Sequence, residues 1–158
     1  MKNSPSKDKS CWGFKYALMG LWHTIRTESH FRFHVCAAIG TTMFTEYYDF
    51  TKYDYALLFM AIFFVLGAEL VNTALEHTVD LCTNEYNEKA KRAKDASAGF
   101  VLVSAIYALF TAVILFWEPK ILFGSLIDIF TKVKYIVFFV LTFLFVWGVG
   151  FKEKKYDR

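Results

Sequence analysis

The chain has 158 residues, of which 56% are hydrophobic and 20% aromatic, and it carries a formal net charge of +3. This length suffices for one compact bundle and excludes a second sizeable domain. The composition is typical of a small membrane protein, and we expect no nucleic-acid partner.

The N-terminal region contains two different segments. Residues 1–12 hold Pro5 and scattered lysines, which predicts a disordered start, and they lack the apolar stretch of a cleavable secretory signal. Ser10–His30 mixes aromatic residues with charged ones. That mixture predicts an amphipathic helix that lies in the membrane interface, and Glu28 sits where this helix meets the first apolar segment.

Four apolar segments follow. Because a helix needs about 20 residues to cross the hydrocarbon core, we expect an all-α membrane protein with four spans. They are Arg32–Tyr48, which is weak and interrupted by threonines, Asp54–Asp80, Ala96–Trp117 and Val133–Phe151. Residues 118–132 are expected to form a connecting loop, and residues 133–158 the last span with a basic tail.

The basic residues predict the orientation of the spans. Residues 1–32 contain six Lys/Arg, residues 81–95 contain four, and the tail after Phe151 contains four, whereas residues 46–54 contain only Lys52. Basic residues favour the cytoplasmic side. We therefore expect a multi-pass protein of the cell membrane with a cytoplasmic N-terminus, 81–95 loop and tail.

The second span carries polar residues that lipid does not favour, namely Glu69, Asn72, Glu76 and Asp80. At about 100° per residue, all four project from one stripe of a helix that opens toward the cytoplasm. A charge at mid-bilayer costs about 2.5–3.5 kcal/mol on insertion scales, so the stripe indicates a functional site. The alternative is a set of polar contacts that hold helices together.

A run of charges opens the third span and includes Lys91, Lys94 and Asp95. By itself such a run is typical of a cytoplasmic anchor. Beside the stripe, it favours phosphoryl transfer, because carboxylates can hold a divalent cation and lysines can hold phosphates. The chain contains neither a Gly-x-x-x-x-Gly-Lys-[Ser/Thr] loop nor the glycine-rich loop of soluble kinases.

Two other kinds of site receive little support. Cys11, Cys36 and Cys82 are far apart in the sequence, which argues against a structural disulfide or a zinc site. A proton or ion transporter could use the acidic stripe as its conduction path. Transport would not need the loop acids and Lys94 beside that stripe, so a kinase is the favoured class.

Several motifs then point to one family. They are Phe14-Lys15-Tyr16 with Gly20-Leu21, Glu28 with Phe31-Arg32, Glu69-Leu70-x-Asn72-Thr73-Ala74-x-Glu76-x-x-x-Asp80, and Glu85-Tyr86 with Ala93-Lys94-Asp95-x-x-Ala98-Gly99. With them the chain resembles the small bacterial integral-membrane lipid kinases, which comprise diacylglycerol kinase and undecaprenol kinase. The resemblance covers residues 13–117, the expected kinase domain. It implies a homotrimer of three-span subunits with an amphipathic surface helix and active sites shared between neighbours.

The resemblance also implies roles for individual residues. ATP is the implied co-substrate and Mg²⁺ the implied cofactor. Glu69 is implied as the general base on the primary hydroxyl of the lipid, and it lies about 16 Å below the cytoplasmic end of its helix, where a carboxylate is partly desolvated. The remaining implied roles are metal binding for Glu28 and Glu76, shaping of the site for Asn72 and Asp80, phosphate binding for Lys94, and nucleotide contacts for Tyr16, Glu85, Asp95 and Asn87, the last of which is often histidine in the family.

The sequence also bears on the identity of the lipid. The stretches Glu28–His34 and Ala90–Asp95 resemble undecaprenol kinases more than the diacylglycerol-specific branch. In the diacylglycerol-specific branch an acidic residue commonly occupies the position of His34. A glycine seen in one branch of the family is replaced here by Lys91, which favours the other branch. His34 is therefore either a contact of the lipid substrate or an ordinary interfacial histidine. The predicted acceptor is undecaprenol, giving undecaprenyl phosphate, and the alternative is diacylglycerol, giving phosphatidate.

Overall fold

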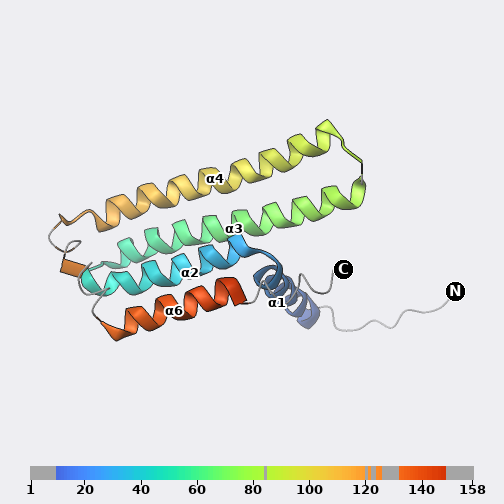
Figure 1. The fold of residues 1–158 in the computed structure, drawn as a ribbon. Helices are drawn as coiled ribbons and strands as arrows, with labels where there is room; N and C mark the ends of the chain where they lie inside the picture. Colours follow the sequence, from blue (N-terminus) through green and yellow to red (C-terminus); the bar gives the residue numbers. More distant parts are fainter. Residues whose placement is uncertain (1–9, 84, 120, 122–123, 126–131, 149–158) are drawn as a thin grey trace.

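The computed structural model describes residues 10–83, 85–119, 121, 124–125 and 132–148. Its elements are α1 (Ser10–Thr27), α2 (Ser29–Phe44), the short helix η1 (Thr45–Tyr47), α3 (Lys52–Cys82), α4 (Glu88–Phe116) and α6 (Val133–Gly148). No β-strand occurs in these ranges. The predicted all-α class is confirmed, and Figure 1 shows α2, α3, α4 and α6 packed lengthwise.

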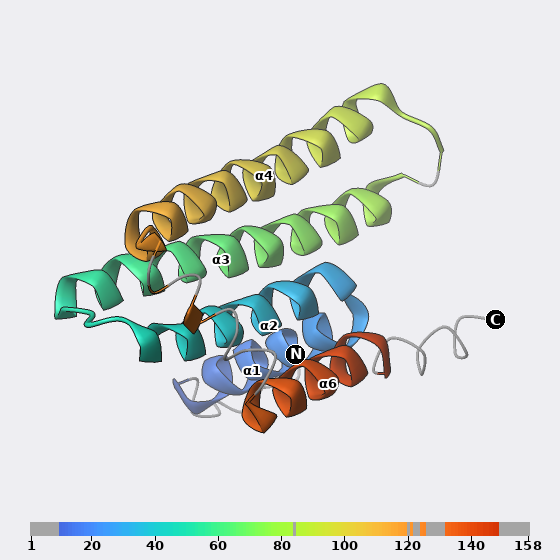
Figure 2. The ribbon, with the colours of Figure 1, turned by 60° about the vertical axis from the view of Figure 1, so that its left-hand side comes forward.

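The longest elements, α3 and α4, form a hairpin whose helices lie side by side in both ribbon views (Figures 1 and 2). They contain 31 and 29 residues, and both are long and apolar enough to cross a membrane. At 1.5 Å per residue each helix measures about 45 Å, which exceeds the roughly 30 Å of hydrocarbon. The two helices continue past the start of α2, so one end of the hairpin extends beyond α2.

The other two apolar helices are shorter. α2 and α6 have 16 residues each, and α2 packs between α3 and α6. Each therefore measures about 24 Å, less than the hydrocarbon thickness. α6 begins at Val133 as predicted, while residues 149–151 of that span and the basic tail lie outside the described residues. The number of membrane crossings stays a prediction.

The N-terminal helix α1 begins at Ser10, where the amphipathic helix was predicted to begin. The disordered start predicted for residues 1–12 overlaps its first three residues, which are helical, so that boundary is wrong. Residues 1–9 lie outside the described part. Large apolar side chains on α1 are exposed, among them Phe14, Met19 and Trp22. An isolated helix with such side chains suits the membrane interface.

The elbow between α1 and α2 is held by a buried arginine. Glu28 interrupts the helix with extended backbone angles, φ −96° and ψ 111°. Arg32 is only 2% exposed, and its Nη1 donates to the carbonyls of Ile25 at 3.0 Å and Arg26 at 2.8 Å. A guanidinium on the last carbonyls of a helix satisfies orphan acceptors and complements the helix dipole. This contact fixes where Glu28 lies.

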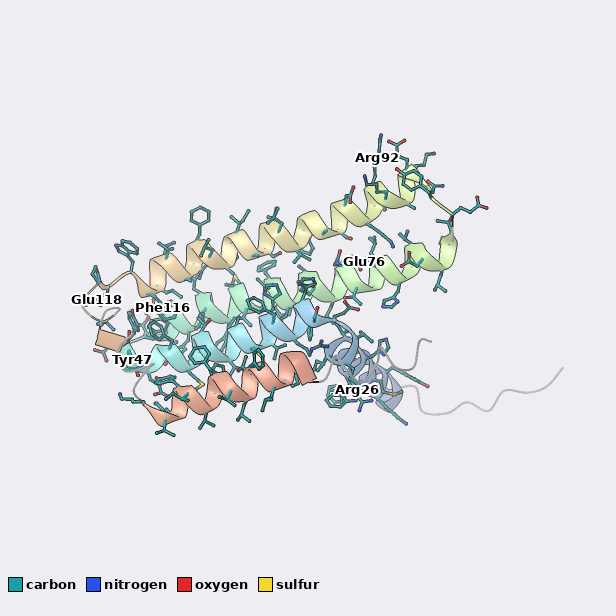
Figure 3. The ribbon with its side chains drawn as sticks, viewed as in Figure 1. Arg26, Tyr47, Glu76, Arg92, Phe116 and Glu118 are labelled. Atoms are coloured by element: carbon teal, nitrogen blue, oxygen red, sulfur yellow. The ribbon has the colours of Figure 1, made fainter. Side chains whose placement is uncertain are left out.

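An aromatic cluster closes the opposite end of the bundle. Phe44, Tyr48 and Phe50 each have their ring centre within 5.4 Å of the ring centre of Phe116 at the end of α4, and Tyr48 donates to the Phe116 carbonyl at 3.0 Å. Figure 3 shows Phe116 at the end of the bundle remote from Arg92. Thr51 begins α3 with a reciprocal capping box to Asp54. These contacts fix the register of α2 against the hairpin.

Candidate active site

Glu69 is a buried carboxylate in the apolar part of α3. It is 7% exposed, and its Oε1 lies 3.2 Å from Nε2 of His34 on α2. Because a buried charge is costly unless it is paired, this contact explains how the carboxylate is tolerated. The structure thus places His34, the candidate lipid contact, against Glu69, the residue that the resemblance implies as the base.

Asn72 and Glu76 lie about one turn apart on α3 and bond to each other. Asn72 Nδ2 donates to Glu76 Oε1 at 2.9 Å, and Ser97 Oγ of α4 lies 2.6 Å from Asn72 Oδ1. Ser97 is 7% exposed and also lies 2.9 Å from the carbonyl of Lys94. Because an ionised carboxylate only accepts, the amide nitrogen of Asn72 faces Glu76, and its amide oxygen is left to accept from Ser97. Sequence reasoning missed Ser97, whose signal was the small-residue run at the start of the third span.

The next polar pair lies near the connection between the end of α3 and the start of α4. Lys94 Nζ of α4 donates to Asp80 Oδ1 of α3 at 2.5 Å, with 66% of the Asp80 side chain exposed. An exposed ion pair of this kind is worth about 0–1 kcal/mol. Lys94 can therefore exchange this partner for an anionic ligand at little cost.

The predicted polar stripe is present but divided between two neighbours. Glu69 bonds to α2, whereas Asn72 and Asp80 bond to α4. Figure 3 shows Glu76 on the part of α3 that continues past the start of α2. The part of the stripe around Glu76 is therefore not covered by α2, while Glu69 is buried.

The interfacial helix also approaches this end of α3. The rings of His23 on α1 and His77 on α3 have their centres 6.3 Å apart. Glu28 is half-buried, and within the described residues its carboxylate makes neither a hydrogen bond nor an ion pair. The structure places Glu28 at the elbow beside the site but does not bring it into contact with Glu76.

The loop residues have more varied positions. Asn87 caps α4, because its Oδ1 accepts from the backbone nitrogens of Lys89 at 2.9 Å and Ala90 at 3.4 Å. This capping gives Asn87 a structural role that does not require a bound nucleotide. The other predicted nucleotide contacts of this region, Glu85 and Asp95, are exposed. Tyr16 is exposed on α1.

The donor chemistry of the site suits Mg²⁺ held partly by a substrate. In the described part of the chain, no three His, Cys, Asp or Glu side chains gather around one point. Mg²⁺ is usually bound by one or two carboxylates together with waters and substrate phosphates, so a dedicated cage is not required. Asn72 donates to Oε1 of Glu76 and leaves Oε2 available to a cation.

The cysteines whose side chains the structure describes, Cys36 and Cys82, are free thiols, of which the first is buried and the second exposed.

Comparisons with known proteins show the family of this chain. The family model described as prokaryotic diacylglycerol kinase matches residues 15–116. The undecaprenol kinase of Bacillus subtilis is 38% identical over 68% of this chain and 87% of its own length. The diacylglycerol kinase of Escherichia coli K12 is 31% identical over 65% of this chain and 84% of its own length. The diacylglycerol kinase of Synechocystis is 35% identical over 67% of this chain and 61% of its own length.

The match spans α1 through α4 and includes every candidate site residue. It decides between the two functional classes that the acidic stripe allowed, because the relatives are named kinases and not transporters. The chain belongs to the prokaryotic diacylglycerol kinase family and is a membrane lipid phosphotransferase.

Proposed function

We propose that the chain transfers the γ-phosphate of ATP to the primary hydroxyl of undecaprenol, giving undecaprenyl phosphate and ADP. The observation that carries this proposal is the buried Glu69, whose carboxylate is held by His34 inside an apolar helix pair. A buried base among apolar helices can meet the hydroxyl of a membrane lipid. Water-soluble alcohols would reach such a base less readily. Diacylglycerol, giving phosphatidate, is the alternative acceptor.

Glu69 acts as the general base. With a proton on Nε2, His34 donates to Oε1 of Glu69, which leaves Oε2 to accept the hydroxyl proton. As that proton leaves, the alcohol oxygen attacks the γ-phosphorus, the bond to the bridging oxygen of ADP breaks, and a phosphate monoester forms. The proton on Glu69 then passes to solvent or product. His34 orients the carboxylate and contacts the lipid headgroup.

The nucleotide occupies the open end of the site. Glu28 and Glu76 would hold Mg²⁺, which when bound neutralises charge on the phosphates. Asn72 fixes the Glu76 carboxylate, and Asp80 releases Lys94 to the phosphates. Tyr16, Glu85 and Asp95 line the nucleotide from α1, the 83–87 loop and α4. Asn87 supports this loop as the α4 cap.

Undecaprenol is favoured by two observations. The undecaprenol kinase of Bacillus subtilis is 38% identical to this chain, against 31% for the diacylglycerol kinase of Escherichia coli K12. In addition, His34 contacts the base directly, at the position where the diacylglycerol branch commonly has an acid. A histidine and an acid beside Glu69 differ in charge and hydrogen bonding, so this position is suited to lipid selection.

We further propose a homotrimer in the cell membrane, with residues 13–117 as the kinase domain and active sites shared between neighbours at the cytoplasmic face. The basic residues among positions 81–95 support this orientation, because they lie in the first turns of α4 and flank the open end of the stripe. The exposed apolar residues of α3 and α4 suit lipid or a neighbouring subunit.

The test is a kinase assay on the full-length protein purified in detergent. Labelled ATP and Mg²⁺ are supplied with undecaprenol or with diacylglycerol, and the lipid products are separated. We expect a higher kcat/KM with undecaprenol. A higher kcat/KM with diacylglycerol would show that the lipid is wrongly assigned, and no product with either would refute both acceptors.

A pair of variants tests the role of His34. His34→Glu places an acid beside Glu69 and should shift the ratio of activities from undecaprenol toward diacylglycerol. His30→Glu is the matched control, because His30 lies one turn earlier on α2 and is exposed. Equal effects of both variants on the ratio would contradict a role of His34 in lipid selection.

A further inference from the structure

An apolar groove, with a cavity volume of about 550 Å³, lies between α2, the end of α4 and α6. Its walls include Phe33 and Phe44 of α2, Trp117 after α4, and Phe138 of α6. Along α2 it extends from residue 33 to residue 44, which corresponds to about 16 Å at 1.5 Å per residue. This volume lies within the range of small-molecule sites, about 300–1,000 Å³.

Specific contacts seat α6 as one wall of this cavity. A Cβ atom on Gly40 would lie 3.3 Å from Cε1 of Phe138, so the glycine permits the close approach of the two helices. The ring of Tyr135 stacks on that of Tyr47 with centres 6.0 Å apart, and Lys134 forms an ion pair with Glu46. α6 is therefore docked against α2 and η1 by specific side-chain contacts.

A second, smaller cavity lies next to this groove and reaches His34. It measures about 110 Å³ and lies between α2, α3 and α4. Ala37, Thr41 and Ala112 line both cavities, and His34 lines the smaller one. Because His34 contacts Glu69, the smaller cavity borders the residue that holds the candidate base.

We propose that this groove binds the hydrocarbon chain of the lipid alcohol and that α6 makes the enzyme selective for long chains. The inference rests on the proposed function. The occupant follows from the residues that line the two cavities. The smaller cavity is lined by His34, which contacts Glu69, and the groove is lined by apolar side chains of α2, the end of α4 and α6. The hydroxyl of Thr41 bonds to its own helix at Ala37 O, 2.7 Å away, so it does not call for a polar ligand.

The groove is a feature that α6 adds to the kinase fold. The family model matches residues 15–116, whereas α6 begins at Val133. Lipid tails are as apolar as the helix surfaces, so selection must come from shape rather than from the hydrophobic effect. Small residues at the junction of the two cavities set that shape.

Substitution at this junction tests the proposal. Ala37→Phe and Ala112→Leu narrow it from α2 and from α4, and Ala56→Phe is the control, because Ala56 is an exposed alanine of α3 that lines neither cavity. The substrates are undecaprenol and geraniol, a short alcohol with the same reacting group. If diacylglycerol is the acceptor, dioleoylglycerol and dibutyrylglycerol replace them.

We expect both junction variants to lower kcat/KM for the long chain by about tenfold or more, while activity on the short alcohol stays within about twofold of wild type. Retained activity on the short alcohol also reports a folded site. Equal losses on both alcohols, or no loss on the long one, would overturn the proposal. If Ala56→Phe gave the same selective loss, the effect would not come from the groove.

Photocrosslinking tests the groove without requiring catalysis. A long-chain alcohol with a diazirine at its chain end should label α6 of the full-length protein, and unlabelled undecaprenol should compete. Equal labelling by the methyl ether of the probe would indicate ordinary bilayer lipid and overturn the proposal. Capture of a second copy of the chain by a photoreactive phenylalanine analogue at Phe139 would do the same. Labelling without phosphorylation would refute the proposed function and leave the groove intact.

Discussion

At the scale of single residues, the site works by holding carboxylates in set orientations. Glu69 is enclosed and fixed by His34, whereas Glu76 is held by Asn72 at the open end. The same residue type therefore has two environments on one helix. Such a difference suits one carboxylate to accept a proton and the other to bind a hydrated cation.

Substitution of the two carboxylates should separate these roles. Glu69→Gln keeps the shape of the side chain but removes the proton acceptor, so turnover should fall by about 10²–10⁴-fold with Mg·ATP affinity unchanged. Glu76→Gln should also abolish turnover but weaken Mg·ATP binding. Turnover is measured with saturating substrates, and affinity with a fluorescent nucleotide. Near-normal turnover of Glu69→Gln would show that Glu69 is not the base.

Ser97 is the positioning residue that the structure adds. Ser97→Ala removes the hydroxyl from the Asn72 amide oxygen, so the amide can rotate away from Glu76. The KM for Mg·ATP should rise by about tenfold, as expected for one hydrogen bond of about 1.4 kcal/mol. Ser104→Ala is the control, because Ser104 is also buried on α4 but bonds only to the Phe100 carbonyl of its own helix. A similar rise in both variants would argue against the orienting role.

At the scale of elements, the elbow between α1 and α2 places the interfacial helix over the site. Arg32 bonds to the last carbonyls of α1, and His23 of α1 lies beside His77 of α3. Both contacts hold α1 near the open end of the stripe. The position of Glu28 and Tyr16 therefore depends on an arginine that touches neither substrate in the proposed mechanism.

Loss of that arginine should loosen α1. Arg32→Met removes both hydrogen bonds to the last carbonyls of α1. If their net worth is that of one bond from a charged donor, about 1.5–3 kcal/mol, amide hydrogen exchange in residues 13–27 should accelerate by at least about tenfold. Arg26→Met is the control, since Arg26 is exposed and stacks on Trp22 with its guanidinium carbon 5.0 Å from the ring centre. Unchanged exchange in Arg32→Met would show that α1 is held by other contacts.

At the scale of the whole molecule, the two ends of the stripe are far apart within one chain. Asp80 holds Lys94 eleven residues after Glu69, which corresponds to about 16 Å along α3. Either the nucleotide spans this distance within one subunit, or a neighbour supplies the missing half. The proposed trimer with shared sites corresponds to the second case.

Mixed oligomers distinguish the two cases. Glu69→Gln and Lys94→Ala subunits should each be inactive alone. If neighbours share sites, co-expression should restore part of the activity, because some sites would receive an intact Glu69 from one chain and an intact Lys94 from another. Tagged subunits verify mixing, and phosphorylated lipid is measured. No recovery in verified mixed oligomers would place both residues in the same subunit's site.

The sequence by itself determined the helical class, the polar stripe and the family. Those features are local, because apolar length and a period of about 100° per residue can be read along one chain. The start of α6 at Val133 was predictable for the same reason. The aromatic and charged mixture of residues 10–30 likewise predicted a helix, although its first turn was assigned to the disordered start.

Only the tertiary structure decided which neighbour each polar residue meets. Ser97 lies 25 positions after Asn72, and nothing in their spacing pairs them until α3 and α4 pack. Glu69 contacts α2 and Asp80 contacts α4, although both belong to one predicted stripe. The groove beside α6 depends on three helices at once. Contacts of this kind arise from packing between elements, which the periodicity of one helix does not encode.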